Sequence, residues 1–105
     1  MNAYLVLVTA PADAGRELAR KLVEERLAAC VNQVPGVRSV YRWEGKVVED
    51  EEVLLVIKTT EERLAALMKR VPELHPYQVP EVLALPVAQG HPPYLAWLAE
   101  ATRIS

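Results

Sequence analysis

The chain of 105 residues has little of several residue types, and each shortage excludes a class of protein. The single cysteine, Cys30, cannot form an intrachain disulfide, which favours the reducing cytoplasm. The four glycines form neither a phosphate-binding loop nor a dinucleotide-binding motif. A net charge of −2 provides no basic face for nucleic acid. No apolar run approaches the ~18 residues of a membrane span. We therefore expect neither nucleic acid nor membrane as a partner.

The residues that are present are typical of one soluble globular domain, with 51% apolar and 25% charged side chains. Residues 1–105 are therefore expected to form a single domain. Neither a catalytic triad nor a Cys/His zinc spacing occurs, and we expect no enzymatic reaction.

Hydrophobic periodicity predicts alternating strands and helices. Strands are expected at 4–9, 30–34 continued by 37–43, 46–59 and 82–87, and helices at 13–29, 59–72 and from 92 onward. Thr59 and Glu62 form a capping box at the start of the second helix, which is expected to end at Pro72. Glu44-Gly45 predicts a two-residue hairpin turn. The predicted fold class is α+β, a ferredoxin-like β-α-β-β-α-β sandwich with an additional C-terminal helix and a long central hairpin.

Two features of this arrangement predict a homo-oligomer. Right-handed crossovers place the first and third strands in the centre of a four-stranded sheet, and two helices cover only one of its faces. The other face should then alternate with polar residues, but both central strands are continuously apolar. The return strand from Lys46 to Thr59 would also span roughly 46 Å if extended, whereas a domain of this size has a radius of gyration of about 13 Å. The hairpin must bend or extend beyond its own domain.

The segment from His75 to Glu81 contains one of the two histidines and two prolines, Pro76 and Pro80. Pro76 and Pro80 restrain themselves and the residues before them, so this segment cannot be ordinary helix. A rigid loop with a titratable ring either connects a helix to a strand or carries a site. Both interpretations stay open on the residues alone.

Seven segments carry a family resemblance. They are Thr9-Ala10-Pro11, Leu27-Ala28-Ala29-Cys30-Val31-Asn32, Pro35-Gly36-Val37, Ser39-Val40-Tyr41-Arg42-Trp43-Glu44-Gly45-Lys46, Leu55-Val56-Ile57-Lys58-Thr59, His75-Pro76-Tyr77-Gln78-Val79-Pro80-Glu81 and Tyr94-Leu95-Ala96-Trp97. In this order, over nearly the whole chain, they resemble divalent-cation-tolerance proteins of the CutA type. The resemblance implies a ferredoxin-like fold and a cytoplasmic homotrimer similar in architecture to the PII signalling proteins. It also implies a role in tolerance of copper and other divalent metals, and no catalytic reaction.

The metal ligands implied by the resemblance are incomplete in this chain. Family members proposed to bind copper carry a Cys before Thr-Ala-Pro and a second His before His-Pro-Tyr, where this chain has Val8 and Leu74. His75 remains, and Cys30 is the other candidate metal ligand. Because one imidazole is a poor site for Cu(II), we expect no required cofactor and only weak binding of copper or another divalent cation.

Five further residues are candidates for a pocket or an interface: Trp43, Glu44, Lys58, Tyr77 and Glu81. Lys58 and Glu81 would each belong to an ion pair in a partly buried cleft or present a fixed charge to a small ligand. Trp43 is a packing anchor, an aromatic contact between subunits or a pocket wall. The acidic run 49–52 predicts a solvated edge, or else a weak Ca²⁺ or Mg²⁺ site.

Three function classes follow from these observations. The first is a trimeric binding or signalling protein whose ligand is a metal ion or a small metabolite. The second is a structural trimer that organises a partner protein. The third is a small ferredoxin-like hydrolase such as an acylphosphatase. That chemistry needs a phosphate-binding loop with an Arg after the first strand, and residues 9–13 contain neither Gly nor Arg.

Overall fold

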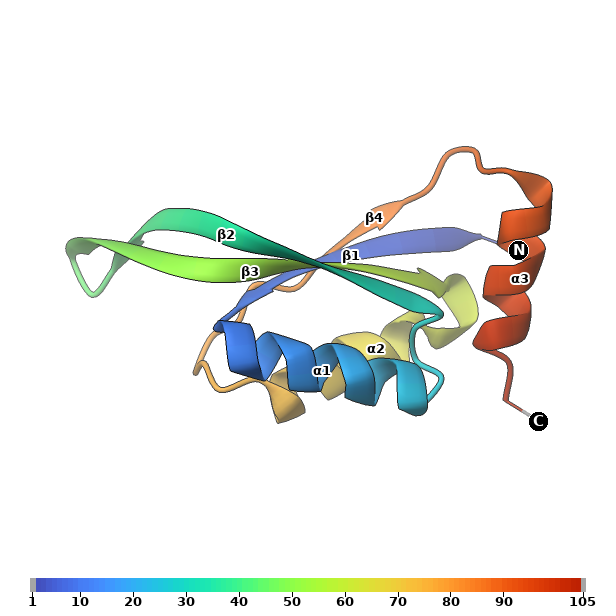
Figure 1. Cartoon of the computed structure of the whole chain (residues 1–105), viewed down its shortest axis with the longest axis horizontal. Helices are drawn as coiled ribbons and strands as arrows, with labels where there is room; N and C mark the ends of the chain where they lie inside the picture. Colours follow the sequence, from blue (N-terminus) through green and yellow to red (C-terminus); the bar gives the residue numbers. More distant parts are fainter. Residues whose placement is uncertain (1, 105) are drawn as a thin grey trace.

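The computed structural model describes residues 2–104 and confirms the predicted order of strands and helices (Figure 1). The elements are β1 (Ala3–Ala10), α1 (Ala12–Glu24), β2 (Cys30–Trp43), β3 (Lys46–Thr60), α2 (Glu61–Leu74), β4 (Leu83–Pro86) and α3 (Pro92–Ala101).

The four strands form one antiparallel sheet in the order β2-β3-β1-β4. The two predicted central strands, β1 and β3, are therefore central. Helices α1 and α2 lie side by side on one face of the sheet, and α3 lies across its end (Figure 1). The other face carries no helix over most of its area, and we call it the open face.

The hydrophobic core lies between the sheet and the two helices α1 and α2. Alternate residues of the central strands point into it, since successive side chains of a strand face opposite sides. The buried core residues include Val6 and Val8 of β1, Leu55 and Ile57 of β3, Leu18 and Leu22 of α1, and Leu67 and Val71 of α2. A core between one sheet face and two helices is the arrangement of a ferredoxin-like α+β domain.

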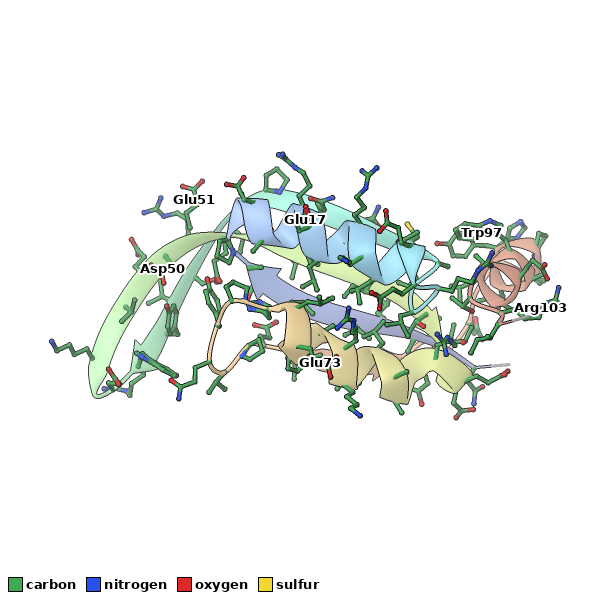
Figure 2. The ribbon with its side chains drawn as sticks, turned by 90° about the horizontal axis from the view of Figure 1, so that it is seen from below. Glu17, Asp50, Glu51, Glu73, Trp97 and Arg103 are labelled. Atoms are coloured by element: carbon green, nitrogen blue, oxygen red, sulfur yellow. The ribbon has the colours of Figure 1, made fainter. Side chains whose placement is uncertain are left out.

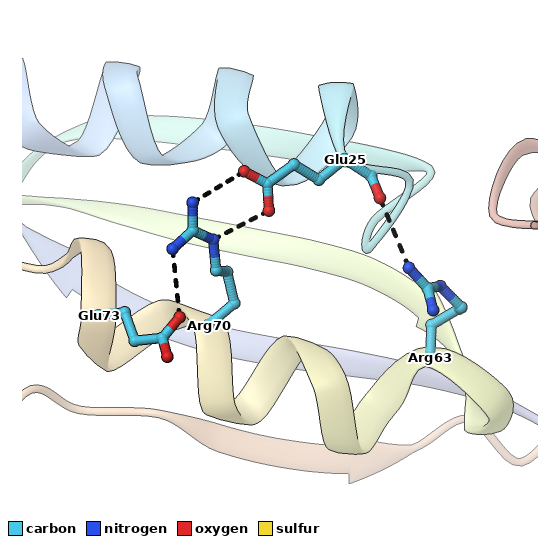
Figure 3. Close-up of polar contacts among 4 residues, drawn as sticks. All are labelled: Glu25, Arg63, Arg70 and Glu73. Atoms are coloured by element: carbon cyan, nitrogen blue, oxygen red, sulfur yellow. Dashed lines mark hydrogen bonds and ion pairs between the residues drawn. The ribbon is translucent and has the colours of Figure 1, made fainter.

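An ion-pair cluster joins α2 to the segment after α1 (Figure 3). Arg70 donates to both carboxylate oxygens of Glu25, at 2.9 and 3.0 Å, and to Glu73 at 3.1 Å. Arg63 donates to the main-chain carbonyl of Arg26 at 3.1 Å. The Arg70 guanidinium lowers the pKa of Glu25. These contacts hold α2 in place, and α2 in turn positions the loop that follows it.

Two helix boundaries differ from the sequence prediction. Helix α1 ends at Glu24 rather than Ala29, because Arg26 adopts a positive φ of 60° that no helix continues. Helix α2 continues past Pro72 to Leu74. The N–H of His75 donates to the carbonyl of Val71 at 2.9 Å, so the helical hydrogen bonds resume directly after the proline.

The predicted capping box is wrong. The residue before α2 is Thr60, and Thr59 still belongs to β3. The hydroxyl of Thr59 is fully buried and donates to the carbonyl of Leu27 at 2.7 Å. Its hydroxyl therefore connects β3 to the loop after α1 instead of capping a helix.

The β2–β3 hairpin extends beyond the helices, and we call its outer part, residues 37–52, the arm (Figure 1). Glu44 and Gly45 have φ of 50° and 78°, which confirms the predicted two-residue turn. The pairing register of β2 shifts between Val34 and Val37, where the arm begins. The molecule measures 44 × 25 × 21 Å, and the long dimension includes the arm.

Candidate functional site

A groove of about 690 Å³ lies between the arm and the loop that follows α2. Its lining residues are Thr9, Ser39, Val40, Tyr41, Trp43, Glu52, Tyr77, Gln78, Val79, Pro80 and Glu81. We call it the arm groove. Its volume is within the range of small-molecule sites. The proline-containing loop thus forms one wall of a cavity, as well as connecting α2 to β4.

His75 lies behind this loop, buried with 7% of its surface exposed. Its Nδ1 accepts the main-chain N–H of Tyr77 at 3.1 Å. The other ring nitrogen, Nε2, therefore carries the hydrogen and donates to the carbonyl of Thr9 at 2.8 Å. Both nitrogens are engaged, so His75 joins the end of α2 to β1 and has no free lone pair for a metal ion.

Tyr77 contacts a buried carboxylate in the groove. Its hydroxyl donates to Glu52 at 2.7 Å, and Glu52 has 6% of its surface exposed. Burial, followed by the bond to Glu52, raises the pKa of Tyr77. On the outer part of the arm the hydroxyl of Tyr41 donates to Asp50, and this bond raises the pKa of Tyr41.

Sequence reasoning missed Glu52, because it treated the acidic run 49–52 as a solvated edge. The other three members of the run are exposed, but Glu52 is the innermost and lies under Tyr77. Its position directly before the apolar run that begins at Val53 was the sequence feature that could have indicated its burial.

The predicted pocket residues divide into two groups. Trp43, Tyr77 and Glu81 line the arm groove. Glu44 lies in the hairpin turn, outside the groove, and Lys58 lies near the opposite end of β3. Within residues 2–104 no ion pair joins Lys58 to Glu81, so the structure does not bring these two charges together in one chain.

The two candidate metal ligands are also far apart. Cys30 lies beside Lys58, whose Nζ is 3.8 Å from the Cys30 sulfur. Lys58 pairs with Leu5, four residues and therefore about 13 Å along β1 from Thr9, to which His75 is bonded. In the described part of the chain no three His, Cys, Asp or Glu side chains are placed to hold a metal ion. The donor atoms of one chain do not fit a copper site, and binding at His75 or Cys30 stays a prediction.

The open face of the sheet is largely apolar, as predicted, although the register also places Asn32 and Lys58 on it. The strand register places leucine and valine side chains there from all four strands: Leu5, Leu7, Val34, Leu54, Val56, Leu83 and Leu85. Leu83 is 56% and Leu85 43% exposed. Such a contiguous apolar surface marks an interaction site. Over residues 2–104, no helix has both the length and the apolar character needed to cross a bilayer.

Taken together, the four-stranded sheet, the helix pair on one face and the protruding arm define a ferredoxin-like α+β protein. Residues 4–101 match the family model of the CutA1 divalent ion tolerance protein, and the chain belongs to this family. This membership confirms the resemblance carried by the seven sequence segments.

Individual relatives agree with this assignment. The chain is 57% identical over 99 residues to the divalent-cation tolerance protein CutA of Thermus thermophilus, covering 93% of this chain and 96% of the relative. It is 52% identical over 96 residues to mouse protein CutA, covering 90% of this chain but only 54% of the mouse protein. The crystal structure of CutA1 from Oryza sativa superimposes with a TM-score of 0.95 at 52% identity, covering 100% of this chain and 97% of that one.

Proposed function

We propose that the chain is a cytoplasmic homotrimeric binding protein that contributes to tolerance of divalent metals, copper among them, without catalysing a reaction. The observation that carries this proposal is the apolar open face. A lone chain in water would expose leucines such as Leu83 and Leu85 on one face of its sheet.

A second copy of the chain is the partner that best suits this face. Apolar strands of another copy would remove the leucines from water, and the arm extends far enough to contact a neighbouring subunit. The number three comes from the family resemblance, which also implies an architecture like that of the PII signalling proteins.

Native mass spectrometry tests the assembly. A trimer has a mass of about 35 kDa, three times the 11.7 kDa of one chain. Leu85 and Val23 have similar exposure, 43% and 42%, but only Leu85 lies on the open face. Leu85→Glu should therefore dissociate the assembly, while Val23→Glu on α1 should leave it intact. A wild-type protein that is monomeric at micromolar concentration would refute the proposal.

The metal role is proposed without a preformed copper site. Copper or another divalent cation would bind weakly, with His75 and Cys30 as the candidate ligands. Because both ring nitrogens of His75 are already hydrogen-bonded, a metal would have to displace one of these bonds. Calorimetric titration with Cu(II) separates the cases. Equal weak binding by wild type and His75→Ala would refute a site centred on His75.

A further inference from the structure

The walls of the arm groove are largely aromatic and aliphatic, with the polar residues Thr9, Ser39 and Gln78 among them. Trp43 and Tyr41 come from the arm, and Tyr77 comes from the loop opposite. Val40 and Val79 are 62% and 66% exposed, so the groove offers apolar surface to a ligand. Flat aromatic walls favour a flat ligand, and the electron-rich faces of such rings attract cations.

The charge of the groove has one sign. Its lining includes two carboxylates, Glu52 and Glu81, and no Lys, Arg or His. The buried Glu52 receives a hydrogen bond from Tyr77 on Oε2. Within residues 2–104 no hydrogen bond is made to its other oxygen, Oε1, and no buried side-chain oxygen lacks a partner, so Oε1 is open to the solvent of the groove. A carboxylate that is mostly buried but open on one oxygen attracts a cation more strongly than one in open water, because the local dielectric constant is lower.

We propose that the arm groove binds a flat organic cation, an amidinium or guanidinium group carried on an apolar body. The cationic group pairs with the carboxylate of Glu52, and its apolar body lies between the aromatic side chains of Trp43 and Tyr77. The planar fork of such a group matches the two oxygens of a carboxylate. A bare metal ion would instead need several oxygen or nitrogen ligands around one point, and within residues 2–104 no three His, Cys, Asp or Glu side chains gather in that way. The inference rests on the proposed role as a binding protein and names the class of ligand.

Three probes with the same ring and different charge test the proposal: benzamidine, benzamide and benzoate. The two tryptophans report the position of binding, because Trp43 lines the groove and Trp97 lies on α3 at the opposite end from the arm (Figure 2). In ¹H–¹⁵N spectra, benzamidine should shift the indole signal of Trp43 and leave that of Trp97 unchanged. Trp97→Phe assigns the two signals. Benzamide and benzoate should give at least tenfold weaker binding.

A matched pair of variants tests the carboxylate. Glu52→Gln removes the charge but keeps an oxygen to accept the Tyr77 hydroxyl, and benzamidine should bind about tenfold more weakly. Glu51→Gln makes the same change at the neighbouring residue, which is exposed on the arm and outside the groove, and it should bind as the wild type does (Figure 2). Equal weakening by both variants would overturn the proposal, because the effect would then be that of net charge. Equal binding of benzamide and benzamidine would also overturn it.

The same samples separate this inference from the proposed assembly. A trimer that shows no shift of the Trp43 signal with benzamidine would overturn the ligand proposal, with the groove filled by a neighbouring subunit, and leave the trimer standing. A monomer in which benzamidine shifts the Trp43 signal would support the ligand proposal and refute the trimer.

Discussion

Replacing Tyr77 by Phe should destabilise the protein, because the carboxylate of Glu52 loses its hydrogen-bond donor. The substitution keeps the aromatic ring and removes the hydroxyl that donates to Glu52 at 2.7 Å. Glu52 is 6% exposed, and among residues 2–104 this is the one hydrogen bond of its carboxylate. A hydrogen bond to a charged group contributes about 1.5–3 kcal/mol. Because the groove lets water reach the other carboxylate oxygen, we expect a loss near 1.5 kcal/mol in the free energy of unfolding at pH 7.

Urea unfolding followed by circular dichroism measures this loss. The protomer concentration must be the same in all samples, since association adds to apparent stability. Tyr41→Phe is the matched control, because Tyr41 also donates to a carboxylate, that of Asp50, but on the exposed arm. We expect little change for Tyr41→Phe. If Tyr77→Phe costs no more than the control, the burial of Glu52 does not strengthen the contact and the reasoning fails.

The same contact predicts the dependence of stability on alkaline pH. The pKa of Tyr77 is raised in the folded state from its ordinary value of 10.0. Above pH 10 the unfolded chain loses this proton while the folded chain keeps it, so stability falls as pH rises. The contribution is complete below pH 10 and is lost above it. Wild type should therefore lose stability above pH 10 more steeply than Tyr77→Phe, and equal slopes would contradict the assignment.

Three further predictions concern Gly15 in the core, the ion pair of Arg70 with Glu25, and His75 behind the groove. A Cβ on Gly15 would lie 2.5 Å from Cγ2 of Val53, so Gly15→Ala should lower the free energy of unfolding by about 1 kcal/mol after its gain in helix propensity is counted. In urea unfolding, the double variant with Val53→Ala should lose less stability than the sum of the two single variants. Arg70 lowers the pKa of Glu25 in the folded chain, so the pair stabilises the fold fully above pH 4.5, and this stabilisation is lost as the pH falls through the lowered pKa. Titration followed by carboxyl ¹³C shifts should show that Arg70→Gln raises the pKa of Glu25 again. His75→Ala removes two partly buried hydrogen bonds and the buried ring, and it should cost about 3 kcal/mol; a loss below about 1 kcal/mol in thermal or urea unfolding would contradict its structural role.

The sequence predicted the fold because its patterns are local and strong. The apolar runs of β1 and β3 and the turn at Glu44-Gly45 each determine their own structure through periodicity or a positive φ. Thr59 shows where such reasoning stops. Its spacing from Glu62 satisfies a capping box, but its hydroxyl is bonded to Leu27, a residue distant in the sequence. Tertiary contacts of this kind have no local signal.

The candidate site was predicted in part for the same reason. Trp43, Tyr77 and Glu81 were selected by residue type and by their place in rigid segments, and they line one groove. Lys58 was selected as a charge in an apolar strand, but the strand register places it away from them. Glu52 was overlooked because its burial depends on Tyr77 lying across it, which only the folded chain shows.

The position of β1 in the sheet has a consequence for the order of folding. The hairpin of β2 and β3 joins neighbouring segments through a two-residue turn, so it can form as soon as that part of the chain exists. Strand β1 is made first, yet it pairs with Val53–Thr60 and with Leu83–Pro86, both distant in the sequence. Strand β1 therefore stays unpaired until β3 has been synthesised and lacks its second neighbour until β4 follows, so its core residues Val6 and Val8 are exposed in the meantime. Pulse-labelling hydrogen exchange should show the amides of the hairpin protected before those of β1.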